Sequence, residues 1–274
     1  MTPRALAFLA RAAALTPAGF DRPLAAVAGR LWCAADGARR TAVAGNRAAL
    51  GARFPLHAPF VRYVETLAGW LRLFGASRAT VRARSSVDGL AVVLDARAAG
   101  RGTVLVAAHV GEWEWGAAAL AARGLEVVAV AGIQLRPAWS EALADAKREL
   151  GVSLVGPGAS PVRLARALRR GAVVALLVDG DLATARRSAQ LGTRRALLPL
   201  GPARLAARTG ARLVAGRCER ASAGYRVRLT PLDAGLAPDD EAGRFESARA
   251  WLTSTLKENP GRWCLFRPFF EATA

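Results

Sequence analysis

Apolar residues in the first quarter of the chain recur at the three-to-four-residue spacing of helices. The clearest case is segment 59–75, "PFVRYVETLAGWLRLFG". Its apolar positions are Phe60, Val64, Leu67, Leu71 and Phe74. Gly75 follows them and is a typical helix stop. The pattern predicts an amphipathic helix across this segment.

Segment 21–35, "DRPLAAVAGRLWCAA", predicts another helix. Asp21 is suited to the N-cap, and Pro23 is tolerated in the first turn because its missing N–H is not needed there. Three apolar residues keep helical spacing along it: Leu24, Val27 and Leu31. Together these patterns predict a helical N-terminal region over residues 1–78 that has the character of a membrane-docking segment.

From about residue 80, short runs of β-type residues alternate with helical segments. The predicted strands are "TVLVAA" (103–108), "EVVAVA" (126–131), "VSLV" (152–155), "AVVALLV" (172–178), "ARLVAGRC" (211–218) and "YRVRLTPL" (225–232). Helical segments follow the first three strands, a loop rich in Gly and Arg follows the fourth, and a last helix covers 240–259. This alternation predicts an α/β fold, with a mostly parallel mixed sheet flanked by helices. We expect residues 79–274 to form one continuous core domain.

The chain contains no run of about 18 uncharged apolar residues, so we expect no membrane-spanning helix. Segment 1–20 also lacks a secretory signal pattern. Its apolar residues Leu6, Phe8, Leu9 and Ala13 are flanked by Arg4 and Arg11. This pattern fits an interfacial membrane helix, and it fits equally a helix packed on the core.

The charge is strongly basic, with 39 Lys and Arg against 21 Asp and Glu and a net charge of +18. Biased use of arginine explains part of this surplus, but it does not explain the sign. A surplus of this size attracts anions such as nucleic acid, anionic lipid head groups or an acidic carrier protein. The three cysteines show no C-x-x-C pattern, so we expect neither a disulfide framework nor a zinc site. We expect the protein to work in a reducing compartment.

One of the two histidines, His109, stands between a predicted strand and a predicted helix in "VLVAAHVGEWEWGAAAL" (104–120). Side chains at the carboxyl end of such strands face the crevice where α/β sheets bind ligands. Glu114 lies five residues later, within reach of the ring, and a carboxylate on one ring nitrogen leaves the other free to take a proton. The pattern thus fits a general base acting on a substrate hydroxyl or amine. A core histidine that caps the helix fits it as well, whereas a metal site is disfavoured because the second histidine, His57, lies far away.

Several blocks in order resemble one enzyme family. "HVGEWE" is similar to the H-x-G-N-W-E block of the bacterial lipid A lauroyl/myristoyl acyltransferases, with Glu112 where Asn is common. These enzymes belong to the lysophospholipid acyltransferase superfamily, which also includes the phosphatidylinositol mannoside acyltransferases. "GNRAALGARFP" (45–55), the stretch 177–214 with its "GPARLAARTGA" end, and "NPGRWCLFRPFF" (259–270) resemble further blocks of the family.

The resemblance implies transfer of a fatty acyl group from a thioester to a lipid hydroxyl. By similarity, His109 deprotonates the hydroxyl and Glu114 orients the imidazole. The positions implied for substrate binding are Arg136, Asp179, Asp181, Arg194 and Arg195. No metal and no cofactor is expected, because acyl carrier protein or coenzyme A arrives as the thioester of the donor substrate.

The expected partners are an anionic membrane surface, the carrier thioester and a glycolipid acceptor such as a lipid A precursor. The expected location is peripheral, on the cytoplasmic face of the bacterial inner membrane. A phosphatidylinositol mannoside type of acceptor is the main alternative. A basic lipid-binding or nucleic-acid-binding protein without activity is a weaker alternative, and no nucleic-acid partner is expected because no recognition motif accompanies the charge.

Overall fold

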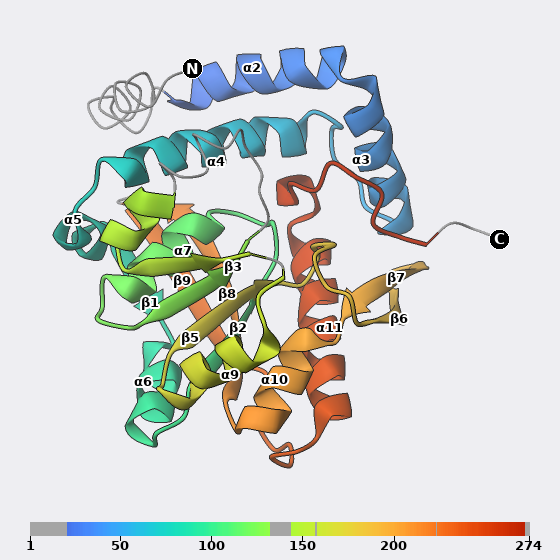
Figure 1. Ribbon diagram of the computed structural model, residues 1–274. Helices are drawn as coiled ribbons and strands as arrows, with labels where there is room; N and C mark the ends of the chain where they lie inside the picture. Colours follow the sequence, from blue (N-terminus) through green and yellow to red (C-terminus); the bar gives the residue numbers. More distant parts are fainter. Residues whose placement is uncertain (1–20, 132–143, 157, 223, 272–274) are drawn as a thin grey trace.

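The computed structural model describes residues 21–131, 144–156, 158–222 and 224–271. A seven-stranded sheet forms its centre, in the order β1-β9-β8-β2-β5-β3-β4 (Figure 1). Its strands are β1 (Ser85–Asp88), β2 (Thr103–Ala107), β3 (Val127–Val130), β4 (Val152–Val155), β5 (Val173–Leu177), β8 (Arg212–Ala221) and β9 (Gly224–Pro231). Neighbouring strands are parallel except for β8 and β9, which are antiparallel. The predicted α/β fold with a mostly parallel mixed sheet is therefore confirmed.

Helices cover both faces of the sheet. The helices of the core are α5 (Arg78–Ala83), α6 (Leu90–Ala98), α7 (Trp113–Ala121), α9 (Pro161–Arg169), α10 (Gly201–Thr209) and α11 (Glu241–Glu258), followed by the 3₁₀ turn η1 (Pro260–Arg262). Successive side chains of a strand point to opposite faces. Val104 and Val106 of β2 accordingly pack in the cluster with α9, α10 and α11, whereas Leu105 packs in the cluster with α6 and α7. Because β2 is buried on both faces, its sequence is a continuous run of mostly apolar residues.

The segment after β5 differs from the predicted loop. It forms an antiparallel hairpin, β6 (Arg186–Leu191) and β7 (Arg194–Pro199), before α10 begins. Each strand begins with two arginines, and beyond them buried apolar residues alternate with more exposed ones. The buried residues are Ala189, Leu191, Ala196 and Leu198. The high arginine content hid this period-two pattern. The short elements β1 and α6 were likewise not predicted.

The N-terminal region is helical as expected, with α2 (Asp21–Ala35), α3 (Gly37–Ala49) and α4 (Ala58–Phe74). Helices α2 and α4 lie side by side above the sheet (Figure 1). Gly29 permits this close approach, because a Cβ there would lie 2.5 Å from the Cα of Val61. The small-residue face of α2 is therefore turned inward, and its larger apolar residues are turned outward. These are Leu24, Val27 and Leu31, which are 70%, 59% and 66% exposed.

The C-terminal segment packs against these helices. The side-chain amide of Asn46 donates to the carbonyl of Arg267 (2.9 Å), and its oxygen accepts from the backbone N–H of Phe269 (3.1 Å). The ring of Phe266 contacts Phe60, with 4.8 Å between centroids. The N-terminal helices thus hold the segment that follows η1, while the expected division at residue 78 stays a prediction. None of the described helices is long and apolar enough to cross a membrane.

Candidate active site

The register of β2 and β5 brings two distant parts of the chain together. These strands are parallel neighbours, and Ala107 is paired with Leu177. Two residues beyond this pair, each strand has ended and the side chains are His109 and Asp179. Both therefore lie at the carboxyl edge of the sheet, where open α/β folds bind their ligands.

His109 and Asp179 form a direct contact. Nδ1 of His109 lies 3.0 Å from Oδ1 of Asp179, and the backbone N–H of His109 donates to Oδ2 at 2.9 Å. Trp263 Nε1 also donates to Oδ2, at 2.8 Å. Asp179 is completely buried, whereas the His109 side chain is 16% exposed. The imidazole thus has one side fixed by a buried carboxylate and another side open to the surroundings.

The electrostatics favour a charged Asp179 and a basic His109. Burial on its own raises the pKa of Asp179, but the charge of His109, with the hydrogen bonds from His109 and Trp263, outweighs it and the pKa is lowered. Burial likewise lowers the pKa of His109, but the charge of Asp179 outweighs it and the pKa is raised. Because an ionised carboxylate only accepts hydrogen bonds, Nδ1–H is the donor of this pair. Nε2 is then the ring nitrogen that carries a lone pair and can take a proton.

Glu114 does not make the expected contact with the imidazole. It lies in the first turn of α7 and forms an ion pair with Lys147, at 2.6 Å between Oε2 and Nζ. Lys147 is 5% exposed. A buried ammonium group requires a charged partner, and this requirement turns Glu114 away from the ring. Asp179 is therefore the carboxylate that orients His109 in the structure, and a part for Glu114 in catalysis stays a prediction.

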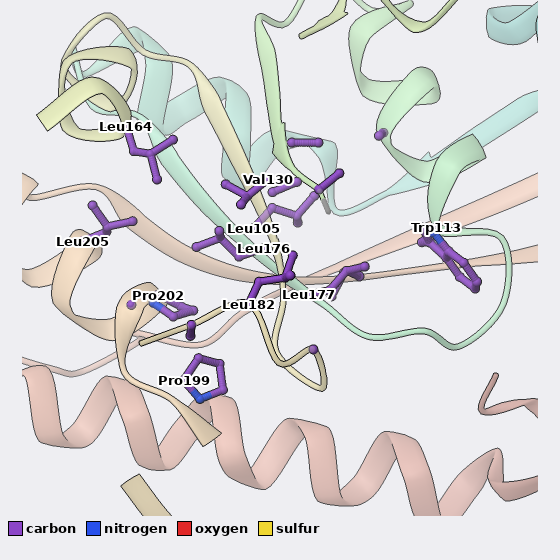
Figure 2. Close-up of a pocket in the computed structure, with 18 of the residues that line it drawn as sticks. Leu105, Trp113, Val130, Leu164, Leu176, Leu177, Leu182, Pro199, Pro202 and Leu205 are labelled. Carbon is purple, nitrogen blue, oxygen red and sulfur yellow. The ribbon is translucent and has the colours of Figure 1, made fainter. Parts of the chain in front are cut away.

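A large apolar cavity opens beside His109. Its volume is about 1090 Å³, and His109, Glu114 and Lys147 lie in its wall. Figure 2 shows the lining extending from Trp113 at one end to Leu164 and Leu205 at the other. Its apolar wall includes Leu105, Leu120, Val130, Leu164, Leu176 and Leu205. This volume lies at the upper end of what small-molecule sites provide, and the wall is suited to a long hydrocarbon chain.

The other predicted substrate-binding residues have different positions. Asp181 lies in the cavity wall and faces Arg267, with 3.5 Å between Oδ2 and Nε. Arg194 and Arg195 begin β7, and the guanidinium of Arg195 donates to the hydroxyl and the carbonyl of Ser188. Neither arginine is among the described residues that line the cavity. Arg136 lies outside the described residues, as does the predicted interfacial helix in residues 1–20.

Three residues of the site were not singled out from the sequence: Lys147, Trp263 and Arg267. Arg267 lies in the cavity wall and donates to the backbone carbonyl of Asp179 at 2.9 Å. Trp263 holds the carboxylate of the same residue. Both belong to "NPGRWCLFRPFF", so its resemblance to a family block was the signal that pointed to them. Lys147 had no such signal, because it stands in an ordinary polar helical segment.

Comparison with known proteins identifies a family. The sequence profile of the family described as bacterial lipid A biosynthesis acyltransferase matches residues 57–271. That range contains His109, Glu114, Asp179, Trp263 and Arg267. A search of curated proteins gave no match. Since the profile covers most of the 274 residues, the chain belongs to the bacterial lipid A biosynthesis acyltransferase family and is an acyltransferase.

Proposed function

We propose that this enzyme transfers a fatty acyl chain from a thioester to a hydroxyl of a glycolipid, with His109 as the general base and Asp179 as the group that orients it. The observation that carries the proposal is the contact of 3.0 Å between these two side chains at the wall of the apolar cavity. An imidazole of raised pKa removes a proton from an alcohol, and the cavity offers a place for the chain being transferred.

The reaction proceeds in two steps. Nε2 of His109 takes the hydroxyl proton as the acceptor oxygen attacks the thioester carbonyl, so a C–O bond forms and the carbonyl oxygen becomes negative. The C–S bond then breaks, and the leaving thiolate takes the proton back from the imidazolium. Asp179 stabilises the imidazolium between these steps, in the same way as the carboxylate of a catalytic triad.

Arg267 is suited to the negative charge that develops on the carbonyl oxygen. Its guanidinium lies in the cavity wall and is held by the carbonyl of Asp179. A positive group that is already in place where charge develops stabilises a transition state without reorganisation, and this contribution is commonly large. Lys147, paired with Glu114 in the same wall, is a second cationic group for an anionic part of either substrate.

The cavity is proposed to hold the acyl chain. Each methylene group that leaves water for such a wall gains about 0.8 kcal/mol. The arginines of the wall include Arg204 and Arg208 of α10, which fit the phosphate of a carrier thioester. The donor is therefore an acyl thioester of acyl carrier protein or of coenzyme A, and Arg136, Asp181, Arg194 and Arg195 stay predicted substrate contacts.

The outer face of α2 is proposed to rest on the membrane. Leu24, Val27 and Leu31 are exposed on it, and Arg22 and Arg30 are exposed beside them. An exposed apolar stripe flanked by arginines fits a helix lying in the interface of an anionic leaflet. The enzyme is then peripheral on the cytoplasmic face, where acyl thioesters and lipid acceptors meet.

A transfer assay tests the proposal. Purified protein receives radiolabelled acyl carrier protein or acyl-coenzyme A thioesters, with lipid A precursors, phosphatidylinositol mannosides and a bacterial lipid extract as separate acceptors. We expect label in a glycolipid, lost by at least 10²-fold in His109→Gln. His57→Asn is the matched control, because it changes the other histidine, at the start of α4, and leaves the site intact. A folded wild-type protein that transfers label to none of these lipids from either donor would overturn the proposal.

A further inference from the structure

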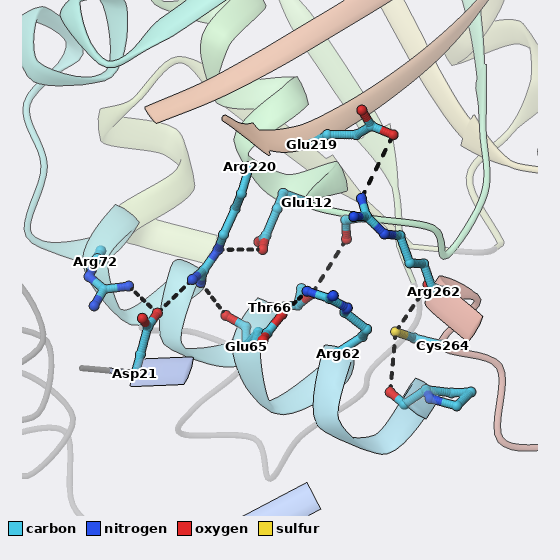
Figure 3. A network of polar contacts seen from close by, with 12 residues as sticks. Asp21, Arg62, Glu65, Thr66, Arg72, Glu112, Glu219, Arg220, Arg262 and Cys264 are labelled. Atoms are coloured by element: carbon cyan, nitrogen blue, oxygen red, sulfur yellow. Dashed lines mark hydrogen bonds and ion pairs between the residues drawn. The ribbon is translucent and has the colours of Figure 1, made fainter. Parts of the chain in front are cut away.

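A network of buried charged side chains connects β8 and the N-terminal helices to Glu112 (Figure 3). Arg220 of β8 is at its centre. Its Nε donates to Oε1 of Glu112 at 2.9 Å, and a terminal nitrogen donates to Oδ2 of Asp21 at 2.6 Å. The same carboxylate oxygen accepts from Arg72 of α4, also at 2.6 Å. The guanidinium also donates to the backbone carbonyl of Glu65.

This arrangement fixes Arg220 from three separate elements: α2, α4 and the loop between β2 and α7. The side chain of Arg220 is 15% exposed, and those of Glu112 and Asp21 are 5% and 7% exposed. Side chains held at this burial by charge-assisted hydrogen bonds have little freedom to move. Arg220 is therefore a rigid point to which the loop is attached.

The loop that it holds is the one that places the imidazole. Glu112 lies three residues after His109 and is the N-cap residue of α7. Its backbone N–H donates to the carbonyl of Cys218 at 2.8 Å, two residues before Arg220 on the same strand. Gly111, with φ of 77°, lies so close that a Cβ there would be 2.2 Å from the same carbonyl. The backbone of the loop thus contacts β8 directly, and the side chain of Glu112 adds a hydrogen-bonded attachment to Arg220.

The opposite side of the loop is held by the carboxylate of Asp179 and by Cys264. Asp179 accepts from the backbone and the ring of His109, and the backbone carbonyl of His109 accepts from the N–H of Cys264. The loop is therefore attached on both sides, and of these attachments only the one through Asp179 belongs to the proposed chemistry. The attachment through Glu112 touches neither the cavity wall nor the imidazole.

We propose that Arg220 is a positioning residue for the transfer reaction: through Glu112 it fixes the loop that places His109 against Asp179. This inference rests on the proposed role of His109 as the base. It assigns a function to Glu112, the one residue of the "HVGEWE" block where the sequence departs from the family pattern. A displacement of the ring by about 1 Å reduces the rate on the order of 10²-fold, so a loose loop lowers kcat while the apolar cavity still binds the chain.

The test compares Arg220→Gln and Glu112→Leu with Glu112→Gln, whose amide oxygen still accepts from Arg220. We expect kcat to fall about 10²-fold in Arg220→Gln and in Glu112→Leu. The KM for the donor should change by less than about threefold, because the cavity that binds its chain is untouched. Glu112→Gln should keep at least about 10-fold more activity than Glu112→Leu, since it retains a hydrogen bond to Arg220.

A matched control separates positioning from general loss of stability. Asp233 is buried and pairs with Arg212, at the opposite end of β2 and β8 from His109. Asp233→Leu breaks an ion pair whose carboxylate is as buried as that of Glu112, without touching the loop. We expect it to lower the temperature of unfolding as much as Glu112→Leu does, while the kcat of the folded protein stays near that of the wild type.

A second measurement is independent of transfer activity. The chain has two histidines, so the ring nitrogen signals of His109 are identified in an NMR spectrum with the help of His57→Asn. In the folded Arg220→Gln and Glu112→Leu variants, these signals should move away from those of a ring with Nδ1–H bound to a carboxylate. The inference would be overturned if both variants kept the wild-type signals and the wild-type kcat. It would also be overturned if they lost no more kcat than Asp233→Leu does. Absence of transfer by the wild type would instead overturn the proposed function, and the NMR result would still decide whether Arg220 positions the ring.

Discussion

Nδ1 of His109 lies 3.0 Å from a carboxylate oxygen of Asp179, a residue 70 positions further along the chain. The pairing of Ala107 with Leu177 sets this distance, because both side chains follow directly from paired strand ends. The contact explains how one imidazole in a largely apolar site keeps a fixed orientation. It also makes Asp179, and not the nearer residue Glu114, the first target for mutation.

Replacement of Asp179 by Asn should cut the rate of transfer at least 10²-fold. The amide no longer stabilises the imidazolium and does not select the Nδ1–H tautomer. Since the charge of Asp179 raises the pKa of His109, that pKa should also fall, and the rise of the rate with pH should move to lower pH. Steady-state rates across pH and an NMR titration of His109 measure both effects. A variant with the pH profile of the wild type would show that Asp179 does not govern the base.

Glu114→Gln should affect activity less than Asp179→Asn, because Glu114 contacts Lys147 and not the ring. Loss of the carboxylate leaves a buried ammonium group with a neutral partner. The free energy of unfolding should therefore fall by about 1–3 kcal/mol, as measured by urea denaturation. If instead activity fell as far as in Asp179→Asn while stability was unchanged, Glu114 would act in catalysis.

The preferred length of the acyl chain should depend on Leu164, a buried residue of α9 at the end of the cavity away from Trp113. Leu164→Trp fills this end and should shift the preference toward shorter chains. Each methylene excluded from the wall costs about 0.8 kcal/mol, or roughly fourfold in kcat/KM. Competition between thioesters of different length measures the shift. Leu197→Trp is the control, because Leu197 is exposed on β7, and a shift of equal size in that variant would contradict this use of the cavity.

Glu112 should make stability depend on pH. Burial is the largest influence on this carboxyl and raises its pKa to about 7, although Arg220 opposes the rise. A group whose pKa is raised on folding stabilises the folded state when protonated, so this contribution is lost as the pH rises from about 4.5 to about 7. Glu112→Gln should match the wild type at pH 4 and exceed it by about 3 kcal/mol in free energy of unfolding at pH 8. Parallel curves for the two proteins would mean that Glu112 is ionised throughout this range.

The outer face of α2 should control membrane binding. Combined replacement of Leu24, Val27 and Leu31 by Ser removes its exposed apolar stripe and should lower the partition to anionic vesicles more than about 10-fold. Co-sedimentation with vesicles of phosphatidylglycerol and phosphatidylethanolamine measures this, and added salt should weaken the remaining attraction. Leu94→Ser, on α6, is the control. Equal binding of the triple variant and the wild type would place the docking surface elsewhere.

The sequence by itself determined the class of fold and the place of His109. Local hydrophobic periodicity is a property of neighbouring residues, so it identified the helices 21–35 and 59–75, the strand at 103–107 and the strand-to-helix turn after it. The resemblance of separate blocks led to the family. Where arginines are frequent, the hydrophobic periodicity was too weak to detect, so β6, β7 and α10 were found only in the structure.

The tertiary structure alone decided which carboxylate meets the imidazole. In sequence Glu114 is five residues from His109, and Asp179 is 70 residues away. The choice depends on which strand pairs with β2, which is β5 and not β3, and on the register of that pair. No local sequence pattern encodes the strand order or the register. It depends as well on Lys147, whose buried charge engages Glu114. The sequence therefore located His109, whereas the long-range strand order and the need to neutralise buried charge decided that Asp179 is its partner.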